Sequence, residues 1–317
     1  MAGFGTLGHI ARNALGAFVL AVAAFGVPAQ AQPAIWTVKD EDSTIYLLGT
    51  VHLLKPDTVW DSEKLDAAIA AADTLWQELS TSDPMALAVE LAPLVVKYGV
   101  SQDRTLSSIL TPDEMKTLDE AAKLGGLSGA ALNRFRPWYA ALNISNAAVV
   151  RAGYDPMSGV DGKIEAKFKM RGIRPNGLET AEEQIKVFAG MGEDEQLSYL
   201  RETMKEYRNA STELDTMVTA WASGDVETLE NVFVSEAKAE GGTFYDALLT
   251  NRNRNWTAKI EEMLAGKGVI FIAVGAGHLV GEDSVLAMLA AKGIKSERYQ
   301  YASTAPPTCA SGCDRRP

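Results

Sequence analysis

Two histidines occur in the same short pattern, each at the end of an apolar run. Gly49-Thr-Val-His52 follows Ile45-Tyr-Leu-Leu, and Gly275-Ala-Gly-His278 follows Val269-Ile-Phe-Ile-Ala-Val. Apolar runs of this kind are typical of strands buried on both faces, as in a parallel sheet. Imidazole is both a metal ligand and an acid or base near neutral pH, so a matched pair of histidines at strand ends predicts a functional site.

Two glutamates end shorter strand candidates, at residues 73–79 and 174–179. These are Glu78 and Glu179. Ligands of open α/β sheets bind outside the carboxyl ends of the strands, where these carboxylates could meet the histidines. Such a donor set suits zinc, manganese, iron or cobalt. The alternatives are that Glu78 is a surface carboxylate on an edge strand and that Glu179 stabilises the dipole of the next helix.

The spacing of apolar residues and turns predicts the elements that carry these side chains. A hairpin is expected over 34–38 and 43–48, and a helix over 62–72 leads to the strand at 73–79. Strand, helix and strand form a βαβ unit, which implies a parallel pair. Capping boxes at Thr111-Pro-Asp-Glu114 and Thr180-Ala-Glu-Glu183 begin two further helices.

We therefore expect an α/β fold with a central, mainly parallel sheet. The sheet is expected to be built from two related strand–GxxH units, with a large helical insertion between them at about 84–250. A helix at 284–291 and a strand at 296–301 close this domain, which is assigned to residues 32–303.

The composition excludes some classes of function. The 317 residues are 47% hydrophobic and 22% charged, so wholesale disorder is not expected. The formal net charge is −11 and the pI is near 4.9. An acidic chain without a basic stripe argues against a nucleic-acid partner.

Both ends of the chain differ from its middle. Residues 1–31 have the pattern of a signal peptide: Arg12, an apolar run over 14–27, and the cleavage motif Ala29-Gln-Ala31. His9, the third histidine of the chain, lies within this segment. We expect a periplasmic or secreted protein with no stable membrane span after processing; the alternative is a permanent membrane helix.

We expect residues 304–317 to form a flexible tail, which contains Cys309 and Cys313, the two cysteines of the chain. In an exported protein this pair is a disulfide candidate, and the alternative is a metal-binding pair.

Several segments resemble the TraB/GumN family, which is related to the Tiki-type metalloproteases. They extend over most of residues 36–301 and are Tyr46-Leu-Leu-Gly-Thr-Val-His52, Gly159-Val-Asp161, Leu178-Glu-Thr-Ala-Glu-Glu-Gln184, Arg252-Asn253 and Val274-Gly-Ala-Gly-His278-Leu. The resemblance implies a divalent-metal-dependent hydrolase with peptidase-like activity. Its substrate would be a peptide or a small molecule.

On this basis we expect His52, Glu78 and His278 to hold one divalent ion (Mn, Co, Zn or Fe). Glu179 is expected to be a general base or a further ligand. Arg252 is expected to stabilise an oxyanion or bind a substrate carboxylate; the alternative is a surface cation near a helix start. The side chains expected to orient the ligands are those of Asp161, Gln184 and Asn253.

Two other functions fit the same residues. One is a metal-independent, esterase-type hydrolase that uses histidine as the general base. The other is a non-catalytic protein in which the two histidines bind a metal ion or haem.

Overall fold

The computed structural model describes residues 32–208, 210–239 and 242–300. The expected signal peptide at 1–31 and the tail with Cys309 and Cys313 lie outside the described residues. Among the helices of the described ranges, none has both the length and the apolar character needed to cross a membrane.

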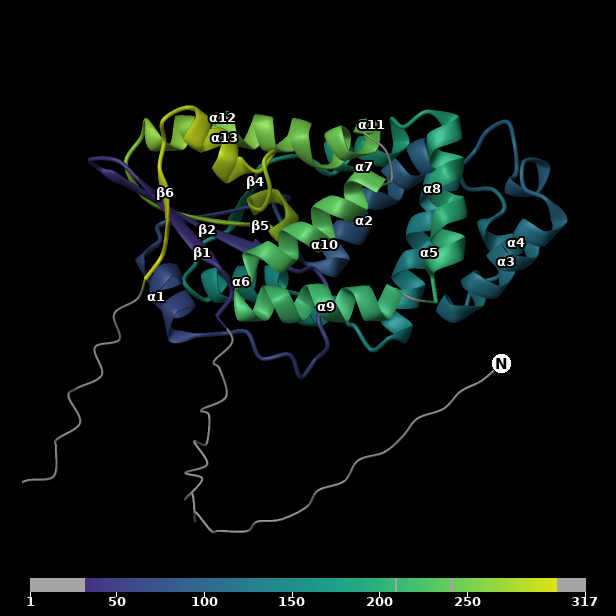
Figure 1. The fold of residues 1–317 in the computed structure, drawn as a ribbon, viewed down its shortest axis with the longest axis horizontal. Helices are drawn as coiled ribbons and strands as arrows, with labels where there is room; N and C mark the ends of the chain where they lie inside the picture. The colour runs from purple at the N-terminus through teal and green to yellow at the C-terminus, as the bar shows by residue number, and fades with distance from the viewer. Residues whose placement is uncertain (1–31, 209, 240–241, 301–317) are drawn as a thin grey trace, which may run out of the picture.

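Six strands form one sheet in the order β4-β3-β5-β2-β1-β6 (Figure 1). Their bounds are β1 Ile35–Lys39, β2 Ser43–Thr50, β3 Thr74–Gln77, β4 Pro175–Gly177, β5 Gly268–Gly275 and β6 Ser296–Arg298. β5 pairs in parallel with β2 and β3, and β3 pairs in parallel with β4. β1 is antiparallel to β2 and β6. The prediction of an α/β fold with a mostly parallel sheet is confirmed.

Two finer expectations about the sheet are not met. β2 and β3 do not pair directly, because β5 lies between them. The centre suits β5, whose residues Phe271, Ile272 and Ala273 are fully buried. The description as two related units is also not confirmed. β2 is the second strand of a hairpin with β1, whereas β5 follows a helix. Of the two histidines, His278 lies in a 3₁₀ turn, η6 (Ala276–Leu279), and His52 does not.

Helices cover both faces of the sheet. α1 (Glu63–Ala71), α6 (Val160–Met170) and α9 (Ala210–Ser223) pack on one face, and α12 (Asn251–Leu264) and α13 (Val285–Ala291) pack on the other. Side chains of β2 alternate between the two cores: Tyr46 and Leu48 join the first, Ile45 and Leu47 the second. The result is a three-layer α/β/α arrangement, visible at the left of Figure 1.

The remaining helices lie between β3 and β5 in the chain. They are α2 Pro84–Leu94, η1 Val95–Gly99, η2 Leu106–Ser108, α3 Pro112–Ala122, η3 Lys123–Gly125, α4 Gly129–Leu132, α5 Pro137–Arg151, η4 Pro156–Ser158, α7 Ala181–Ala189, α8 Glu193–Glu206, α10 Val226–Ala239, α11 Gly242–Tyr245 and η5 Asp246–Thr250. Both expected capping boxes are present, at Thr111 and Thr180. α3, α5 and α8 share a separate apolar core, at the right of Figure 1.

The register of the central pair brings the two histidine segments together. Thr50 of β2 lies opposite Gly275 of β5, so the chain leaves both strands at the same edge. The segment that carries His52 is held by a second close contact. A Cβ added to Gly159 would lie 2.2 Å from the backbone oxygen of His52, and Val160 N donates a hydrogen bond to Val51 O at 3.0 Å. The start of α6 therefore fixes the backbone at His52.

We predict that Gly159→Ala destabilises the protein by about 1–3 kcal/mol, the usual range for overpacking. Gly162→Ala is the matched control, because Gly162 lies inside α6 and an added Cβ there meets no atom within 4 Å. It should stabilise the fold by about 0.5–1 kcal/mol through helix propensity. Denaturant unfolding measures both changes, and equal stability of the two variants would contradict the assigned contact.

Candidate functional site

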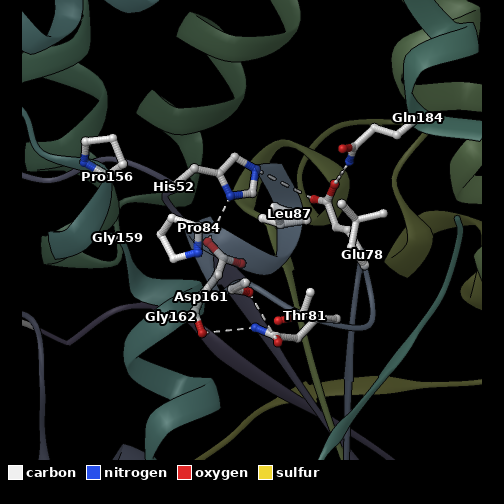
Figure 2. Close-up of a pocket in the computed structure, with 13 residues that line it drawn as sticks. His52, Glu78, Thr81, Pro84, Leu87, Pro156, Gly159, Asp161, Gly162 and Gln184 are labelled. Carbon is white, nitrogen blue, oxygen red and sulfur yellow. Dashed lines mark hydrogen bonds and ion pairs between the residues drawn. The ribbon is translucent and has the colours of Figure 1, made fainter. Parts of the chain in front are cut away.

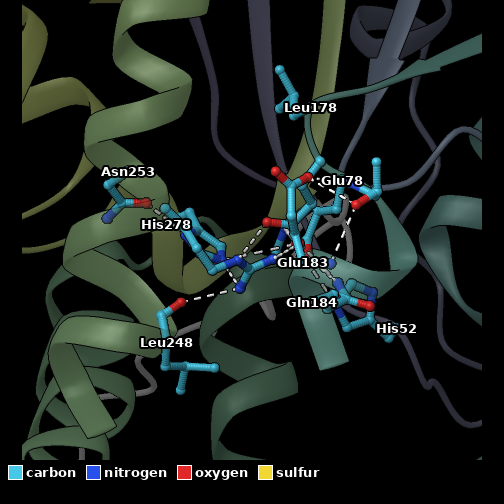
Figure 3. A network of polar contacts seen from close by, with 12 residues as sticks. His52, Glu78, Leu178, Glu183, Gln184, Leu248, Asn253 and His278 are labelled. Carbon is cyan, nitrogen blue, oxygen red and sulfur yellow. Dashed lines mark hydrogen bonds and ion pairs between the residues drawn. The ribbon is translucent and has the colours of Figure 1, made fainter. Parts of the chain in front are cut away.

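Three side chains converge at the carboxyl ends of the parallel strands. His52 follows β2, Glu78 follows β3 and His278 follows β5. Each histidine Nε2 lies 3.9 Å from Glu78 Oε1. Figure 3 shows Glu78 close to His278 on one side and to His52 on the other. Residues far apart in the sequence thus direct two imidazole nitrogens and one carboxylate oxygen at a common point.

His52 is oriented through its other nitrogen. Its Nδ1 lies 2.8 Å from Asp161 Oδ2, in the first turn of α6. Asp161 is itself fixed, because Thr50 Oγ1 donates to Oδ1 at 2.8 Å and Gln77 Nε2 donates to its backbone oxygen at 3.0 Å. In the neutral ring, a carboxylate that accepts from Nδ1–H leaves the lone pair on Nε2, toward Glu78.

His278 is oriented in the same way by an amide. Its Nδ1 lies 2.6 Å from Asn253 Oδ1, while Asn253 Nδ2 donates to Asp283 O at 2.7 Å. The second bond fixes which end of the amide faces the ring, so His278 carries its proton on Nδ1. The Trp256 ring packs against the imidazole, with 4.3 Å between centroids. His278 therefore also presents a lone pair on Nε2.

Arg252 lies at the centre of the network and is only 8% exposed. The alternative that it is a surface cation is therefore wrong. Its guanidinium is bidentate to Glu179, with Nε to Oε2 at 2.9 Å and Nη2 to Oε1 at 2.6 Å. Nη2 also donates to Glu78 Oε2 at 2.6 Å. Nη1 donates to His278 Nε2 at 3.0 Å and to Leu248 O, within the π-helical turn η5, at 3.1 Å.

The two glutamates are joined by one further side chain. Gln184, on α7, donates through Nε2 to Glu78 Oε2 and to Glu179 Oε1, both at 3.1 Å. The Gly275 backbone N–H donates to Glu78 Oε1 at 2.8 Å. Every charged group of the cluster thus has fixed partners, as buried charges require.

The pKa values of the two histidines are shifted in opposite directions. Burial, and then the charge of Arg252, lower the pKa of His278 to about 3, so this ring stays neutral. The charge of Asp161 and its hydrogen bond to the ring raise the pKa of His52 to about 9. Burial disfavours the charged form of Glu78, but Arg252 and the other positive partners hold its pKa at about 2. Burial raises the pKa of Glu179 in spite of Arg252.

A cavity opens beside these residues (Figure 2). It encloses about 810 Å³, including solvent at its mouth, and its lining includes His52, Glu78 and Asp161. The ring of His52 is 58% exposed, whereas that of His278 is 6% exposed. Pro84 and Leu87 of α2 form part of the wall. The cavity therefore reaches the cluster from the side of His52.

The donor types at this site fit a divalent ion, but the donor positions do not form a closed ligand set. Tetrahedral coordination at about 2.1 Å would place donors about 3.4 Å apart, less than the 3.9 Å found here. Within the described ranges, no group of three or more His, Cys, Asp or Glu residues is arranged to hold an ion. Arg252 instead contacts both His278 and Glu78.

The structure brings together all eight site residues that the sequence analysis named and that are described: His52, Glu78, Asp161, Glu179, Gln184, Arg252, Asn253 and His278. Sequence reasoning missed Thr50 and Gln77, which hold Asp161. Both are buried polar residues at strand ends, and that position was the available signal. It also missed Leu248 O, which as a backbone acceptor left no signal in the sequence.

The chain is detectably similar to known proteins over most of its described length. Residues 34–298 match the TraB/PrgY/gumN family. The uncharacterized protein YbaP of Escherichia coli (strain K12) is 25% identical over 264 residues, which cover 81% of this chain and 92% of YbaP. An uncharacterized protein of Treponema pallidum (strain Nichols) is 22% identical, over 79% of this chain and 78% of its own. No solved structure matches.

We predict that Asp161→Asn lowers the pKa of His52 in chelator-treated protein, because the carboxylate that raises it to about 9 is lost. The raised pKa stabilises the folded state fully below the unfolded-state value of about 6.5, and this contribution disappears as the pH rises through about 9. NMR titration of the His52 ring measures the shift. Thr50→Val, which keeps the carboxylate, is the control; a His52 pKa that is equal in wild type and Asp161→Asn would contradict the assignment.

Proposed function

The chain belongs to the TraB/PrgY/gumN family, and from the geometry of its site we propose that it is an exported, divalent-metal-dependent hydrolase with peptidase-like activity. The supporting observation is the convergence of His52 Nε2 and His278 Nε2 on Glu78 Oε1, at 3.9 Å each. His52, Glu78 and His278 would hold the ion, with manganese, cobalt, zinc or iron as the candidates.

A bound divalent ion would supply Lewis acidity, which activates water and polarises a scissile carbonyl. The chain's own residues prepare the site for this chemistry. Asp161 and Asn253 hold the two Nδ1 atoms, so that the Nε2 atom of each ring faces the cluster. Glu179, whose pKa is raised by burial, is the candidate to accept a proton as general base or to serve as a further ligand.

The cavity supports an uncharged or positively charged peptide segment as the substrate. Its described lining contains the carboxylates of Glu78 and Asp161 and no lysine or arginine. The wall formed by Leu79, Pro84 and Leu87 is apolar. Such a surface would bind apolar side chains of a substrate, and its two carboxylates would repel a carboxylate of the substrate. A small molecule of the same character is the alternative substrate.

A metal-independent hydrolase is the second candidate, and the contact between Asp161 and the partly exposed His52 ring favours it. With a pKa of about 9, His52 would be protonated at neutral pH. It could then donate a proton to a substrate, and it would become a general base only after losing that proton. Turnover that survives chelation would favour this candidate. A stoichiometric ion or haem without turnover would favour a binding protein.

We predict that the purified mature protein binds one divalent ion per chain and that His278→Ala and Glu78→Gln lose it. Removal of one of three ligands should also lower the rate of peptide hydrolysis by at least about 100-fold. Elemental analysis after loading, together with a peptide-hydrolysis assay, measures both effects.

Glu90→Gln is the matched control, since Glu90 is an exposed carboxylate on α2. It should keep both the ion and the activity. If the wild type binds no ion at any concentration tested, or if His278→Ala retains the ion and hydrolysis, the proposed function is wrong.

We also predict that Leu87→Asp raises the KM for an apolar peptide by about tenfold with little change in kcat, because it replaces an apolar contact by a charge that must be desolvated. Leu87 lines the cavity. Met85→Asp is the control on the same helix, since Met85 is 77% exposed and does not line the cavity. Equal KM values for the two variants would count against α2 as a substrate wall.

A further inference from the structure

We propose that Arg252 is a built-in competitor of the metal ion: its guanidinium takes the position at His278 that the ion needs, and it must leave His278 before the ion can bind. The inference rests on the proposed function, because it concerns the ion assigned there. It assigns to Arg252 control over the metal affinity of the site.

The competition follows from a single lone pair. Asn253 Oδ1 accepts the proton on Nδ1 of His278, so Nε2 carries one lone pair and no proton. Arg252 Nη1 donates to that lone pair at 3.0 Å. A lone pair that accepts this hydrogen bond cannot also coordinate an ion. Arginine and ion are therefore mutually exclusive at His278.

The charges act in the same direction. Arg252 is the counter-ion of Glu78 and Glu179, with Nη2 at 2.6 Å from a carboxylate oxygen of each. Both carboxylates are less than one-tenth exposed, so solvent screens these pairs weakly. A cation so close to Glu78 Oε2 repels a second cation, and it also neutralises a negative charge that would otherwise attract one.

Arg252 can give up His278 without losing its place. A guanidinium has five N–H groups, and the structure gives five acceptor contacts: two to Glu179 and one each to Glu78, Leu248 O and His278. Loss of the contact to His278 leaves four. The contacts to Glu179 alone fix the plane of the group. Release frees one Nη1–H group, the donor of Arg252 that can then interact with a substrate.

The test compares metal dissociation constants of the mature chain after removal of bound ions with a chelator. Mn²⁺ and Zn²⁺ are titrated separately into the wild type and into Arg252→Met, with binding followed by calorimetry or by competition with a chelating dye. We expect at least about tenfold tighter binding by Arg252→Met, the effect of losing one charged donor and one positive charge. Arg254→Met, at an exposed position on the same helix, should match the wild type.

Arg252→Met leaves two buried carboxylates without their cation, so the variant may be compared only if it folds. A charge-balanced pair avoids this difficulty: Glu179→Gln alone, and Glu179→Gln combined with Arg252→Met. The double variant should bind the ion more tightly than Glu179→Gln by a similar factor. Thermal unfolding with and without Mn²⁺ gives an independent readout, with a larger metal-induced rise in Tm for each variant that lacks Arg252.

Two results would overturn the inference, and they have different meanings. If the wild type binds the ion and the folded variants without Arg252 bind it equally or more weakly, Arg252 does not compete, and the proposed function stands. If neither the wild type nor any variant binds an ion, the proposed function fails together with the inference.

Discussion

Eight residue pairs join β2 to β5 in parallel, and the site depends on this register. It ends with Thr50 opposite Gly275, so His52 and His278 follow from the same edge of the sheet. A slip of one residue would turn each side chain of the strand to the other face and exchange its two cores. The alternating burial of β2 between two apolar cores therefore fixes the register, and the register sets the separation of the two histidines.

The second constraint is that buried charges need partners. The side chains of Glu78, Glu179 and Arg252 are about one-tenth exposed or less, and the positive charge of Arg252 balances one of the two negative charges. Asp161 and Asn253 then decide which nitrogen of each histidine faces this cluster. For the proposed ion, the contacts of Asp161 and Asn253 orient the donors, whereas the contact of Arg252 with His278 occupies one of them. The affinity for the proposed ion then depends on a difference in free energy between two states of the cluster. In one state Arg252 contacts His278, and in the other the ion does, so the guanidinium of Arg252 can change the affinity strongly.

The parts of the fold that follow from local patterns were predictable. Apolar runs located the two long strands of the site, and Thr111 and Thr180 marked two helix starts that the structure confirms. The place of β5 between β2 and β3 was not predictable from adjacent segments, because it depends on pairing over about 200 residues of chain. The side-chain types at the site were visible in the sequence. The contact of Arg252 with His278 was not, since it requires the turn η5, α12 and the end of β5 to be placed in three dimensions.

The proposed function requires that both histidines and Glu78 bind a single divalent ion. X-ray absorption spectroscopy of the mature protein loaded with one equivalent of Zn²⁺ tests it most directly, because imidazole rings give outer-shell scattering that water and carboxylate ligands do not. We expect two imidazole ligands in the wild type and one in His52→Ala. A bound ion without imidazole scattering, or a spectrum that His52→Ala leaves unchanged, would contradict it.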